Sequence, residues 1–253
     1  MNQHDINFSG IYAQTYDELY SSLDPRTELQ QAELFCGVAL SKKSAIIDVG
    51  GGTGRFSEIL CKQCNFVYLV EPSPDMISIA TKKLAKFDNL RIICDTAQNF
   101  KLPKRAQRAY LMFSVASYFS SPELFRRAIE NIISNLDTGS VVYFDIWEFN
   151  DSTIDELNDS VKIFTQNDVE YQKITKIKRE SIIEKKSGFY SVLVNIEFQN
   201  FNIGSVYQEN HEIALISKKW IGDFLSQNYQ IRNVRTRSNP NKKNNLEVCI
   251  TLK

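Results

Sequence analysis

Residues 45–56 read AIIDVGGGTGRF, an apolar run that contains one acid, Asp48, and ends in a glycine-rich turn. The four glycines of the turn are Gly50, Gly51, Gly52 and Gly54. A chain gives up its side chains in this way where the backbone must bend sharply or come close to another molecule. The apolar run predicts a buried strand over 45–50, and the next residues predict a helix over about 55–62. We therefore expect the turn between them to contact a ligand.

Two common nucleotide-binding motifs do not fit the spacing of these glycines. The dinucleotide fingerprint G-x-G-x-x-G would need a glycine at position 55, where the chain has Arg55. The phosphate-binding motif G-x-x-x-x-G-K-[ST] fails as well, because Arg55 and Phe56 stand where it needs its second glycine. The pattern that is present is D-V-G-x-G-x-G, from Asp48 to Gly54.

Strands and helices alternate after this turn. The predicted strands cover 45–50, 66–71, 90–94, 109–114 and 141–147, and the predicted helices cover 55–62, 73–87 and 121–136. Ser73 and Ser121, each followed by proline, are expected N-caps, and Thr138-Gly139 is expected to close the last of these helices. Apolar strands that alternate with helices predict a doubly wound parallel sheet with helices on both faces.

The pattern changes on both sides of this region. Residues 12–40 predict helix with a break at Asp24-Pro25. Residues from about 159 to 215 alternate as three to five antiparallel strands, with a hairpin turn at Ser187-Gly188. A helix capped by Ser217 then precedes two last strands of the main sheet; these predicted elements cover 217–229, 230–236 and 246–252.

The predicted fold is of the α/β class, with a doubly wound, mostly parallel, seven-stranded Rossmann-like sheet and an antiparallel β insertion. Residues 1–150 and 216–253 are expected to form the main domain with an N-terminal helical lid. Residues 151–215 are expected to form the insertion, as a substrate cap or a dimer surface. A chain of 253 residues is long enough for this arrangement.

Composition argues against several classes of function. The chain has 30 Lys and Arg against 30 Asp and Glu, so no overall field attracts nucleic acid or an anionic membrane. No apolar stretch approaches the roughly 18–20 residues of a membrane span, and the N-terminus lacks the apolar core of a signal peptide. Five cysteines, an odd number, suit a reducing cytoplasm.

Cys61 and Cys64 form a CxxC motif, but no second such pair and no pair of histidines accompanies it. We expect these thiols to pack at a helix end, with a zinc or redox site as the alternative. No metal is predicted for the site.

The pattern from Asp48 to Gly54 resembles motif I of the class I S-adenosylmethionine-dependent methyltransferases. The resemblance covers about residues 40–147 and the C-terminal strands. It implies that the glycine turn wraps the methionine and ribose parts of S-adenosylmethionine, with S-adenosylhomocysteine as the product. Glu71, 23 residues after Asp48 (71 − 48), matches the acid that accepts hydrogen bonds from both ribose hydroxyls. A carboxylate suits this role because it offers two acceptors side by side.

The same resemblance implies further contacts with the cofactor. Met76 is expected to pack on the adenine, Asp95 to lie near the adenine amino group, and Ser114 to follow the fourth strand beside the reactive methyl. The full set of cofactor residues that it implies is Tyr16, Asp48, Gly50, Gly51, Gly52, Gly54, Glu71, Pro72, Met76, Asp95, Thr96, Ala97, Phe113 and Ser114.

Three segments resemble a narrower group, the nucleotide-linked deoxysugar N-methyltransferases of the amino-sugar N,N-dimethyltransferase type. They are TYDELY (15–20), MFSVASYF (112–119) and NHEIALIS (210–217). The chain departs from the pattern of that group at Val115, Ser117 and Glu212, where a serine, a glycine and an apolar residue are expected.

This second resemblance implies the residues of the acceptor side. Tyr118, Tyr20 and His211 are the predicted catalytic residues, with both tyrosines flanking the acceptor amine and Tyr118 orienting it rather than acting as a strong base. The predicted substrate contacts are Tyr12, Tyr20, Tyr118, Trp147, His211, Arg235 and Arg237. The alternatives stay open that Tyr16 and Tyr20 are core aromatics and that His211 is structural.

Five basic residues follow one another near the C-terminus with no acid between Asp223 and Glu247: Arg232, Arg235, Arg237, Lys242 and Lys243. Solvated loop charge is one interpretation. Since a guanidinium matches the geometry of phosphate, the other is that some of these side chains hold the diphosphate of a nucleotide-sugar.

The favoured function is N-methylation of the amino group of a nucleotide (dTDP)-linked amino-deoxysugar by a cytoplasmic enzyme, with a homodimer considered as its assembly. Neither nucleic acid nor a membrane is an expected partner. The alternatives are N- or O-methylation of another small molecule, and a cofactor-binding protein without transferase activity. RNA or protein methylation fits the neutral charge less well, and Arg55 argues against a nicotinamide dehydrogenase.

Overall fold

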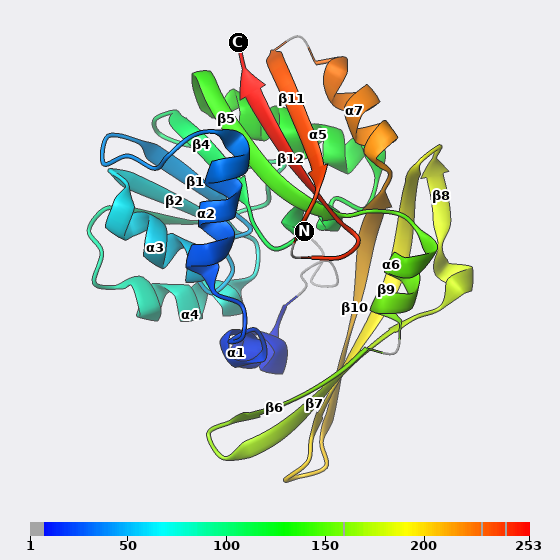
Figure 1. Cartoon of the computed structure of the whole chain (residues 1–253). Coiled ribbons are helices and arrows are strands. Elements are labelled where there is room, and N and C mark those ends of the chain that lie inside the picture. The colour runs from blue at the N-terminus through cyan, green and yellow to red at the C-terminus, as the bar shows by residue number, and fades with distance from the viewer. Residues whose placement is uncertain (1–7, 159, 229, 241) are drawn as a thin grey trace.

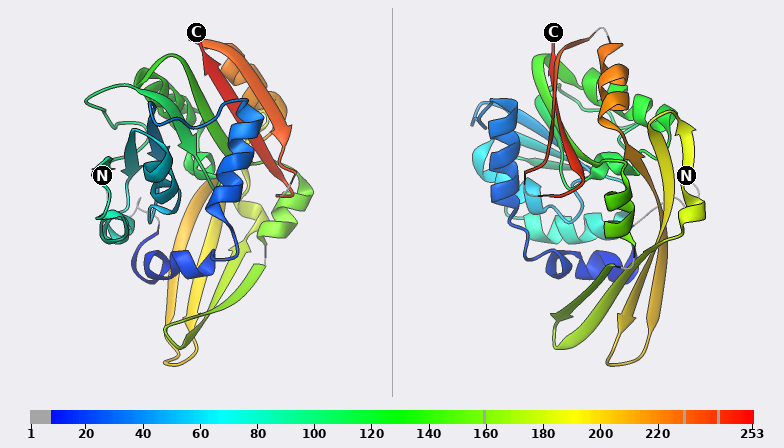
Figure 2. Two further views of the ribbon diagram at one scale, coloured as in Figure 1. Left: turned by 60° about the vertical axis from the view of Figure 1, so that its left-hand side comes forward. Right: turned by 45° about the vertical axis from the view of Figure 1, so that its right-hand side comes forward.

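The structure, a computed structural model, describes residues 8–158, 160–228, 230–240 and 242–253. Within these residues the chain forms two β-sheets (Figure 1). Helices flank the seven-stranded main sheet, and the second sheet, of five strands, extends away from it (Figure 2).

The main sheet has the strand order β11-β12-β5-β4-β1-β2-β3. Its strands are β1 (Ala45–Val49), β2 (Phe66–Glu71), β3 (Leu90–Cys94), β4 (Ala106–Leu111), β5 (Leu136–Trp147), β11 (Ile231–Ser238) and β12 (Asn245–Leu252). The first five pair with one another in parallel, and β12 is antiparallel to both β5 and β11. The predicted α/β fold class, with its mostly parallel sheet and antiparallel insertion, is confirmed.

The strand order reverses between β1 and β4. From β1 the chain crosses outward to β2 and β3, and it then returns to the other side of β1 to form β4 and β5. A switch point of this kind opens a crevice at the carboxyl ends of the two central strands. The glycine turn, residues 50–54, follows β1 directly and therefore lies in this crevice.

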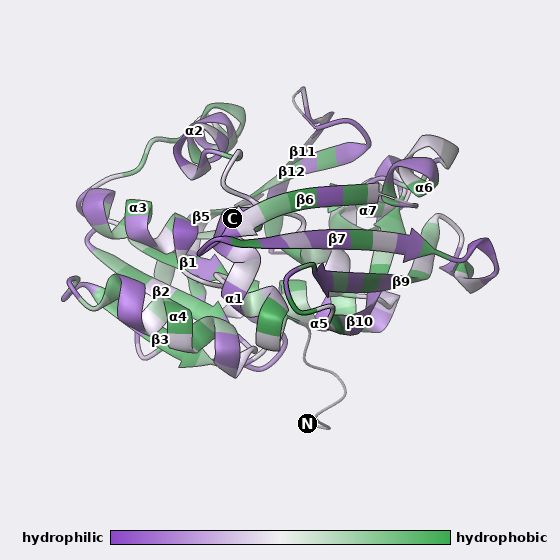
Figure 3. Cartoon of the chain, turned by 90° about the horizontal axis from the view of Figure 1, so that it is seen from below, coloured by the Kyte–Doolittle hydropathy of each residue, from purple (hydrophilic) through white to green (hydrophobic). Residues whose placement is uncertain are grey.

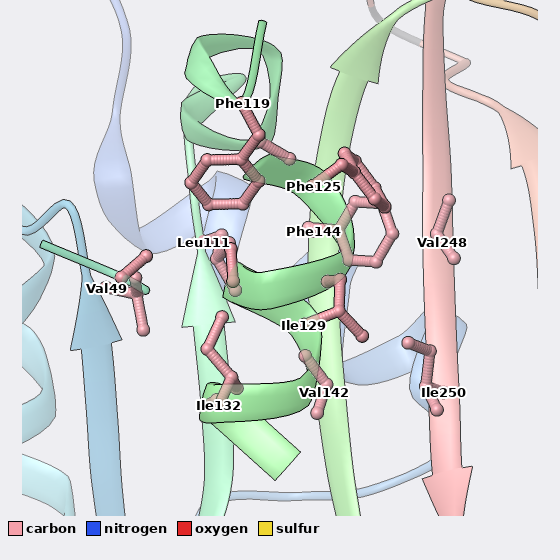
Figure 4. Close-up of a cluster of buried hydrophobic side chains, with 14 of the residues drawn as sticks. Val49, Leu111, Phe119, Phe125, Ile129, Ile132, Val142, Phe144, Val248 and Ile250 are labelled. Atoms are coloured by element: carbon pink, nitrogen blue, oxygen red, sulfur yellow. The ribbon is translucent and has the colours of Figure 1, made fainter. Parts of the chain in front are cut away.

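Helices cover both faces of the main sheet. They are α2 (Pro25–Cys36), α3 (Arg55–Gln63), α4 (Pro74–Leu84), α5 (Pro122–Ser134) and α7 (Lys218–Ser226). On one face, α5 and α7 bury a large core that includes Phe125, Ile129 and Phe144 (Figure 4). On the other face, α2 and α3 pack in one apolar cluster and α4 packs on β2 in another. This core fixes the strand ends that carry the site.

The predicted starts of two helices are confirmed by their caps. The hydroxyl of Ser73 accepts a hydrogen bond from Met76 N–H at the start of α4, and the hydroxyl of Ser121 accepts one from Leu124 N–H at the start of α5. Pro74 and Pro122 stand at the first helical positions, where no donor is needed.

The second sheet is antiparallel, with the order β10-β9-β7-β6 and with β8 paired to β9. Its strands are β6 (Ser160–Gln166), β7 (Val169–Ile177), β8 (Ile183–Lys186), β9 (Phe189–Asn200) and β10 (Val206–Ile216). The predicted turn at Ser187-Gly188 joins β8 to β9. One face of the sheet shares an apolar cluster with α1 (Gly10–Leu19), which lies between the two sheets. Hydrophilic and hydrophobic residues mix along β6 and β7, as expected where the other face meets water (Figure 3).

The predicted helical region 12–40 and its break at Asp24-Pro25 are confirmed, since α1 ends at Leu19 and α2 begins at Pro25 with Asp24 as its N-cap. Two other local predictions were wrong, and one helix was missed. Thr138-Gly139 lies inside β5 because α5 already ends at Ser134, and the positive φ of Gly139 (+76°) accompanies a register shift in the β4–β5 pairing. Strand β4 ends at Leu111 because Phe113 and Ser114 have φ of +69° and +58°. Helix α6 (Asp151–Leu157) was not predicted.

No helix within the described ranges is long and apolar enough to cross a membrane. The main sheet draws its strands from residues 45–147 and 231–252, and the second sheet draws its strands from residues 160–216.

Candidate active site

The glycine turn takes a backbone shape that side chains would obstruct. Gly50, Gly52 and Gly54 have φ of +68°, +55° and +82°, in the left-handed region that favours glycine. A Cβ on Gly50 would lie 2.6 Å from a methyl carbon of Val115, and a Cβ on Gly54 would lie 2.6 Å from one of Leu84. The turn therefore comes close to the loop after β4 on one side and begins α3 on the other.

Glu71 ends β2 and holds the middle of the turn. Its carboxylate accepts hydrogen bonds from Gly52 N–H (3.0 Å) and Ser73 N–H (2.9 Å), and the residue is 6% exposed. Burial raises the pKa of Glu71 to about 7, although the two backbone hydrogen bonds act to lower it. This carboxyl group thus changes its charge near neutral pH.

Asp48 has a different role from Glu71. Its carboxylate accepts a hydrogen bond from the Ser57 hydroxyl at 2.6 Å, which ties the end of β1 to α3. Burial raises the pKa of Asp48 to about 6, while the hydrogen bonds from Ser57 act to lower it. Asp48 lines a small neighbouring cavity together with Gly51, rather than the main pocket.

A pocket of about 630 Å³ opens at the carboxyl ends of β1, β2 and β4, a volume within the usual range for small-ligand sites. The predicted cofactor residues that line it are Tyr16, Gly50, Gly52, Glu71, Pro72, Met76, Asp95, Thr96, Ala97 and Phe113. Asp48, Gly51, Gly54 and Ser114 lie outside its lining. Val49, Val70, Gln98, Val115 and Phe119 line it without having been predicted, although their places beside the predicted residues could have indicated them.

Tyr118 and His211 meet at the acceptor side of the pocket. Tyr118 lines the pocket from a short 3₁₀ helix, η2 (Val115–Tyr118), and its hydroxyl lies 3.0 Å from Nδ1 of His211. His211 is 1% exposed, and its Nε2 lies 2.7 Å from a carboxylate oxygen of Glu209. Burial raises the pKa of Tyr118 well above its ordinary value, so its phenol keeps its proton at neutral pH.

Glu209 was missed in the sequence, although a signal was present. Residues two apart in a strand point to the same face, so an acid two residues before a buried histidine is a natural partner for it. The predicted acids Glu71 and Asp95 lie at or just after strand ends, whereas Glu209 lies inside β10.

The loop that carries Tyr118 is held by β5. Asp145, buried in β5, accepts hydrogen bonds from the backbone N–H (3.0 Å) and hydroxyl (3.1 Å) of Ser114. Trp147 N–H donates to the hydroxyl of Ser117 at 3.1 Å. Ser114 is therefore the N-cap residue that precedes η2, Trp147 anchors η2 through Ser117, and neither Ser114 nor Trp147 lines the pocket.

Three tyrosines lie near this site: Tyr12 and Tyr16 of α1, and Tyr20, which directly follows α1. The ring of Tyr12 stacks on His211 with centroids 5.7 Å apart, and its hydroxyl lies 3.1 Å from that of Tyr20. Tyr16 lines the pocket, while Tyr20 lies outside the lining, against Phe113.

The Tyr20 hydroxyl also accepts a hydrogen bond from the Lys173 ammonium at 3.4 Å. Burial alone would raise the pKa of Tyr20, but Lys173, the hydrogen bond with Tyr12 and the ammonium of Lys162 together lower it.

Helix α1 is fastened over the glycine turn. The guanidinium of Arg55 donates to the backbone oxygens of Tyr20 (2.9 Å) and Leu23 (2.7 Å), and the Thr53 hydroxyl donates to Asp17 at 2.5 Å. Arg55, the residue that excludes the dinucleotide fingerprint, thus holds the N-terminal helix in place.

Arg235 and Arg237 are not brought together with the other predicted substrate residues. They lie on β11, at the edge of the main sheet four strands away from β1. The guanidinium of Arg235 donates to the backbone oxygen of Cys36, and that of Arg237 pairs with Glu247. Of the remaining basic cluster, Lys242 pairs with Glu28 at 2.6 Å. None of these side chains lines the pocket.

Cys61 and Cys64 are buried free thiols. Within the described ranges, no group of three or more His, Cys, Asp and Glu side chains could hold a metal ion.

Comparison with known proteins identifies the core of the chain. Residues 46–139, which include the glycine turn, Glu71 and Tyr118, match the family model described as a methyltransferase domain. This part of the chain is therefore similar to a methyltransferase domain. The matched part begins with the second residue of β1 and ends within β5.

Curated proteins resemble parts of the chain. It is 28% identical over 148 residues, 58% of each protein, to an rRNA adenine N-6-methyltransferase from Limosilactobacillus reuteri. It is 27% identical over 112 residues to the dTDP-3-amino-3,4,6-trideoxy-alpha-D-glucopyranose N,N-dimethyltransferase of Streptomyces venezuelae, covering 44% of this chain and 46% of that protein. The chain thus spans about half the length of these relatives.

Solved structures match the chain over nearly its whole length. DesVI from Streptomyces venezuelae superposes with a TM-score of 0.72 and 17% identity, covering 96% of this chain and 99% of that one. The sugar N-methyltransferase KedS8 from a Streptoalloteichus species gives a TM-score of 0.73 and 13% identity, covering 98% and 95%. Identities this low show the fold alone. The chain, the second sheet included, therefore shares its fold with these solved structures.

Proposed function

We propose that this protein is an S-adenosylmethionine-dependent N-methyltransferase that acts on the amino group of a nucleotide-linked amino-deoxysugar. The observation that carries the proposal is a single pocket in which two sets of groups meet. One set is the glycine turn with the buried carboxyl group of Glu71. The other is Tyr118, which lines the pocket and is hydrogen-bonded to the buried His211 behind the lining.

The cofactor side of the pocket fits S-adenosylmethionine. The close approach of Gly50 to Val115 leaves no room for a Cβ, so the turn presents bare backbone to the pocket. Glu71 offers carboxylate oxygens to a pair of hydroxyls, Met76 an apolar surface and Asp95 an acceptor to an amino group. The bound cofactor would supply an activated methyl group on a sulfonium.

The residues of the chain then have to align the acceptor and receive one proton. Alignment of the amine with the methyl can itself be worth roughly 7–11 kcal/mol. When the nitrogen–carbon bond forms, the amine gives up a proton. The hydroxyl oxygen of Tyr118 can take it while its own proton passes to Nδ1 of His211, 3.0 Å away. Because the pKa of Tyr118 is raised by burial, Tyr118 relays this proton and does not begin as a phenolate.

The charges around the pocket suit the amine end of such a substrate. Among the described residues that line it, none is Lys, Arg or His, whereas Glu71, Asp95 and Glu212 are acids. An amine is compatible with these carboxylates, and a diphosphate is not. The amino-sugar end would therefore occupy the pocket, with the nucleotide diphosphate outside it.

The acceptor class rests on the resemblance in three segments and on the Streptomyces venezuelae relative, whose name specifies a dTDP-linked amino sugar. Methylation of adenine in rRNA is the second candidate, because relatives of that name match 36–58% of the chain. The balance of 30 basic and 30 acidic residues argues against it, since binding to RNA draws on many phosphate contacts.

A panel of acceptors tests the proposal by mass spectrometry. It contains nucleotide-linked amino sugars, the same sugars without the nucleotide, their hydroxyl analogues and an RNA oligonucleotide, each incubated with S-adenosylmethionine. A gain of one or two methyl groups on the nucleotide-linked amines alone is expected. Transfer only to RNA, or only to a hydroxyl, would refute the acceptor class.

Calorimetry with S-adenosylhomocysteine is the control for this panel. Binding of this product without transfer to any acceptor would instead indicate a cofactor-binding protein.

A further inference from the structure

A buried carboxylate, Glu209, lies where the N-terminal segment, the second sheet and the acceptor side of the pocket meet. It stands two residues before His211 on β10, and its side chain is 9% exposed. The proposed function gives it no role.

Five hydrogen bonds converge on this carboxylate. One oxygen accepts from Phe8 N–H at 3.0 Å and lies 2.7 Å from Nε2 of His211. The other accepts from the N–H (2.8 Å) and the hydroxyl (2.9 Å) of Ser9 and from the hydroxyl of Tyr207 (2.6 Å). Burial alone would raise the pKa of Glu209, but the hydrogen bonds from His211, Tyr207 and Ser9 outweigh it and lower the pKa to about 2.

An ionised carboxylate at this place decides where His211 carries its proton. Glu209 can only accept, so the proton of the neutral imidazole must be on Nε2. Nδ1 then has a free lone pair and accepts from the hydroxyl of Tyr118. In the other tautomer Nδ1 would itself be a donor, and the proton of Tyr118 would have no acceptor in His211.

The same carboxylate docks the N-terminal segment, residues 8–10. Three of its five hydrogen bonds come from Phe8 and Ser9. The side chain of Phe8 lines the pocket, and its ring centroid lies 5.3 Å from that of Tyr118 and 5.0 Å from that of His211. The docked segment therefore covers the proton-accepting pair.

The segment is also tied to the cofactor side. The Ser73 hydroxyl donates to the backbone oxygen of Phe8 at 2.8 Å, and Gly10 N–H donates to Asp75 at 2.7 Å. Ser73 N–H in turn donates to Glu71, the proposed ribose acceptor. A continuous set of contacts thus runs from Glu71 through the segment to Glu209.

We propose that Glu209 is a positioning residue that couples docking of the N-terminal segment to the proton-accepting arrangement of Tyr118 and His211. With residues 8–10 docked, the carboxylate is desolvated and His211 is held with Nδ1 facing Tyr118. When the segment leaves, three hydrogen bonds and the cover of Phe8 leave with it, so the histidine ring is no longer fixed. The direction of the proton rests on the proposed function.

The tautomer of His211 is the first test. The chain has two histidines, His4 and His211, so nitrogen-15 NMR of histidine-labelled protein resolves both rings, and a His4→Gln variant assigns them. At a pH where the ring is neutral, His211 is expected to carry its proton on Nε2 with a bare Nδ1. A proton on Nδ1 would overturn the proposal.

The docking of the segment is the second test, made with Glu209→Gln. Whichever way the amide lies, its NH₂ group faces at least one of the N–H groups of Phe8 and Ser9, so at least one of those hydrogen bonds is lost. Amide hydrogen exchange over residues 8–10 should accelerate at least about tenfold, as expected for a hydrogen bond to a charged group. Unchanged exchange would overturn the proposal.

Glu197→Gln is the matched control for this variant. It makes the same chemical change on the neighbouring strand β9, where the carboxylate accepts a hydrogen bond from Gln208 at 2.8 Å. Exchange of residues 8–10 should then stay at the wild-type rate. Neither test needs turnover. A failure of methyl transfer would therefore count against the proposed function only, and the NMR and hydrogen-exchange results would still decide the role of Glu209.

Discussion

The two sides of the pocket are built from different materials. The cofactor side is formed by backbone: a turn of glycines and a carboxyl group, Glu71, that immobilises the turn through a backbone N–H. The proposed acceptor side is formed by side chains from two separate parts of the chain, where His211 of β10 contacts both Tyr118 of η2 and Glu209. A shape made by backbone tolerates few substitutions, whereas a network of side chains can change its chemistry one residue at a time. We infer that the fold constrains the cofactor more tightly than the acceptor.

The largest effect is expected for Gly50→Ala. The new Cβ would meet Val115 at 2.6 Å, and the residue would also hold a φ of +68°. Strain of this kind costs of the order of 1–3 kcal/mol, and we expect binding of S-adenosylhomocysteine to be lost in calorimetry.

Gly139→Ala is the control for this variant. Gly139 also has a positive φ, +76°, but in the described part of the chain no atom lies within 4 Å of its added Cβ. Binding should survive there. Normal binding by Gly50→Ala would show that the cofactor side does not depend on bare backbone.

The next largest effect concerns the charge of Glu71. Its pKa is raised by burial to about 7, and ribose hydroxyls are better held by the ionised form. Affinity for S-adenosylhomocysteine should thus be constant above about pH 8 and should weaken with falling pH, approaching about tenfold per pH unit below 7. Calorimetry over about three pH units, from about pH 5.5 to about pH 8.5, measures this slope.

Glu71→Gln should bind more weakly than the wild type and lose the slope. The contribution of Glu71 to the free energy of unfolding should change with pH in the opposite sense to its contribution to cofactor affinity. The folded pKa lies above the ordinary value of 4.5, so ionisation opposes folding increasingly as pH rises from about 4.5 to about 7. A slope that persists in Glu71→Gln would assign the titration to another group, with Asp48 the nearest candidate.

A smaller effect is expected on the acceptor side, for Tyr118→Phe. The ring stays and the hydroxyl that faces His211 is removed. The value of kcat should fall about 10–100-fold, at the low end for proton transfer by a positioned side chain, because water can still take the proton. Affinity for S-adenosylhomocysteine should stay the same.

If Tyr118→Phe loses all turnover but still binds the cofactor, Tyr118 has a role beyond relaying the proton and orienting the amine. Tyr20→Phe is the comparison, since its hydroxyl pairs with Tyr12 and Lys173 and the residue does not line the pocket.

The same contrast explains how much the sequence could reveal. The turn from Asp48 to Gly54 is a local constraint, so seven consecutive residues predicted the cofactor side and the sheet around it. The acceptor network depends on contacts between residues far apart in the chain: Tyr118 and His211 are 93 residues apart, and Phe8 and Glu209 are 201 apart. No pattern within one segment records such pairs. The individual residues Tyr118 and His211 were predicted through resemblance, while the residue that joins them to the N-terminus was not.

Arg235 and Arg237 show the opposite case, in which a local pattern predicts contacts that the structure does not form. A run of basic residues without acids between them resembles a phosphate site, but their guanidinium groups serve the packing of α2 on β11. The acid that Arg237 neutralises, Glu247, lies four residues beyond Lys243, the last member of the run, and is 1% exposed. The pairing of β11 with β12 brings Arg237 and Glu247 together. A count of charges along the sequence cannot reveal this pairing.

The smallest effect on activity is therefore expected for Arg237→Ala. Glu247 would keep its hydrogen bond from Tyr143 at 2.8 Å but lose its cation, which should lower the free energy of unfolding by about 1–3 kcal/mol in urea titration. The KM for a nucleotide-linked acceptor should change by less than about twofold, because a shift below 0.4 kcal/mol is expected where no contact is lost. Arg232→Ala, an exposed member of the same cluster, is the control and should alter neither quantity. A tenfold rise in KM with normal stability would instead place the diphosphate on β11, and the acceptor side would then extend across four strands of the main sheet rather than ending at the pocket.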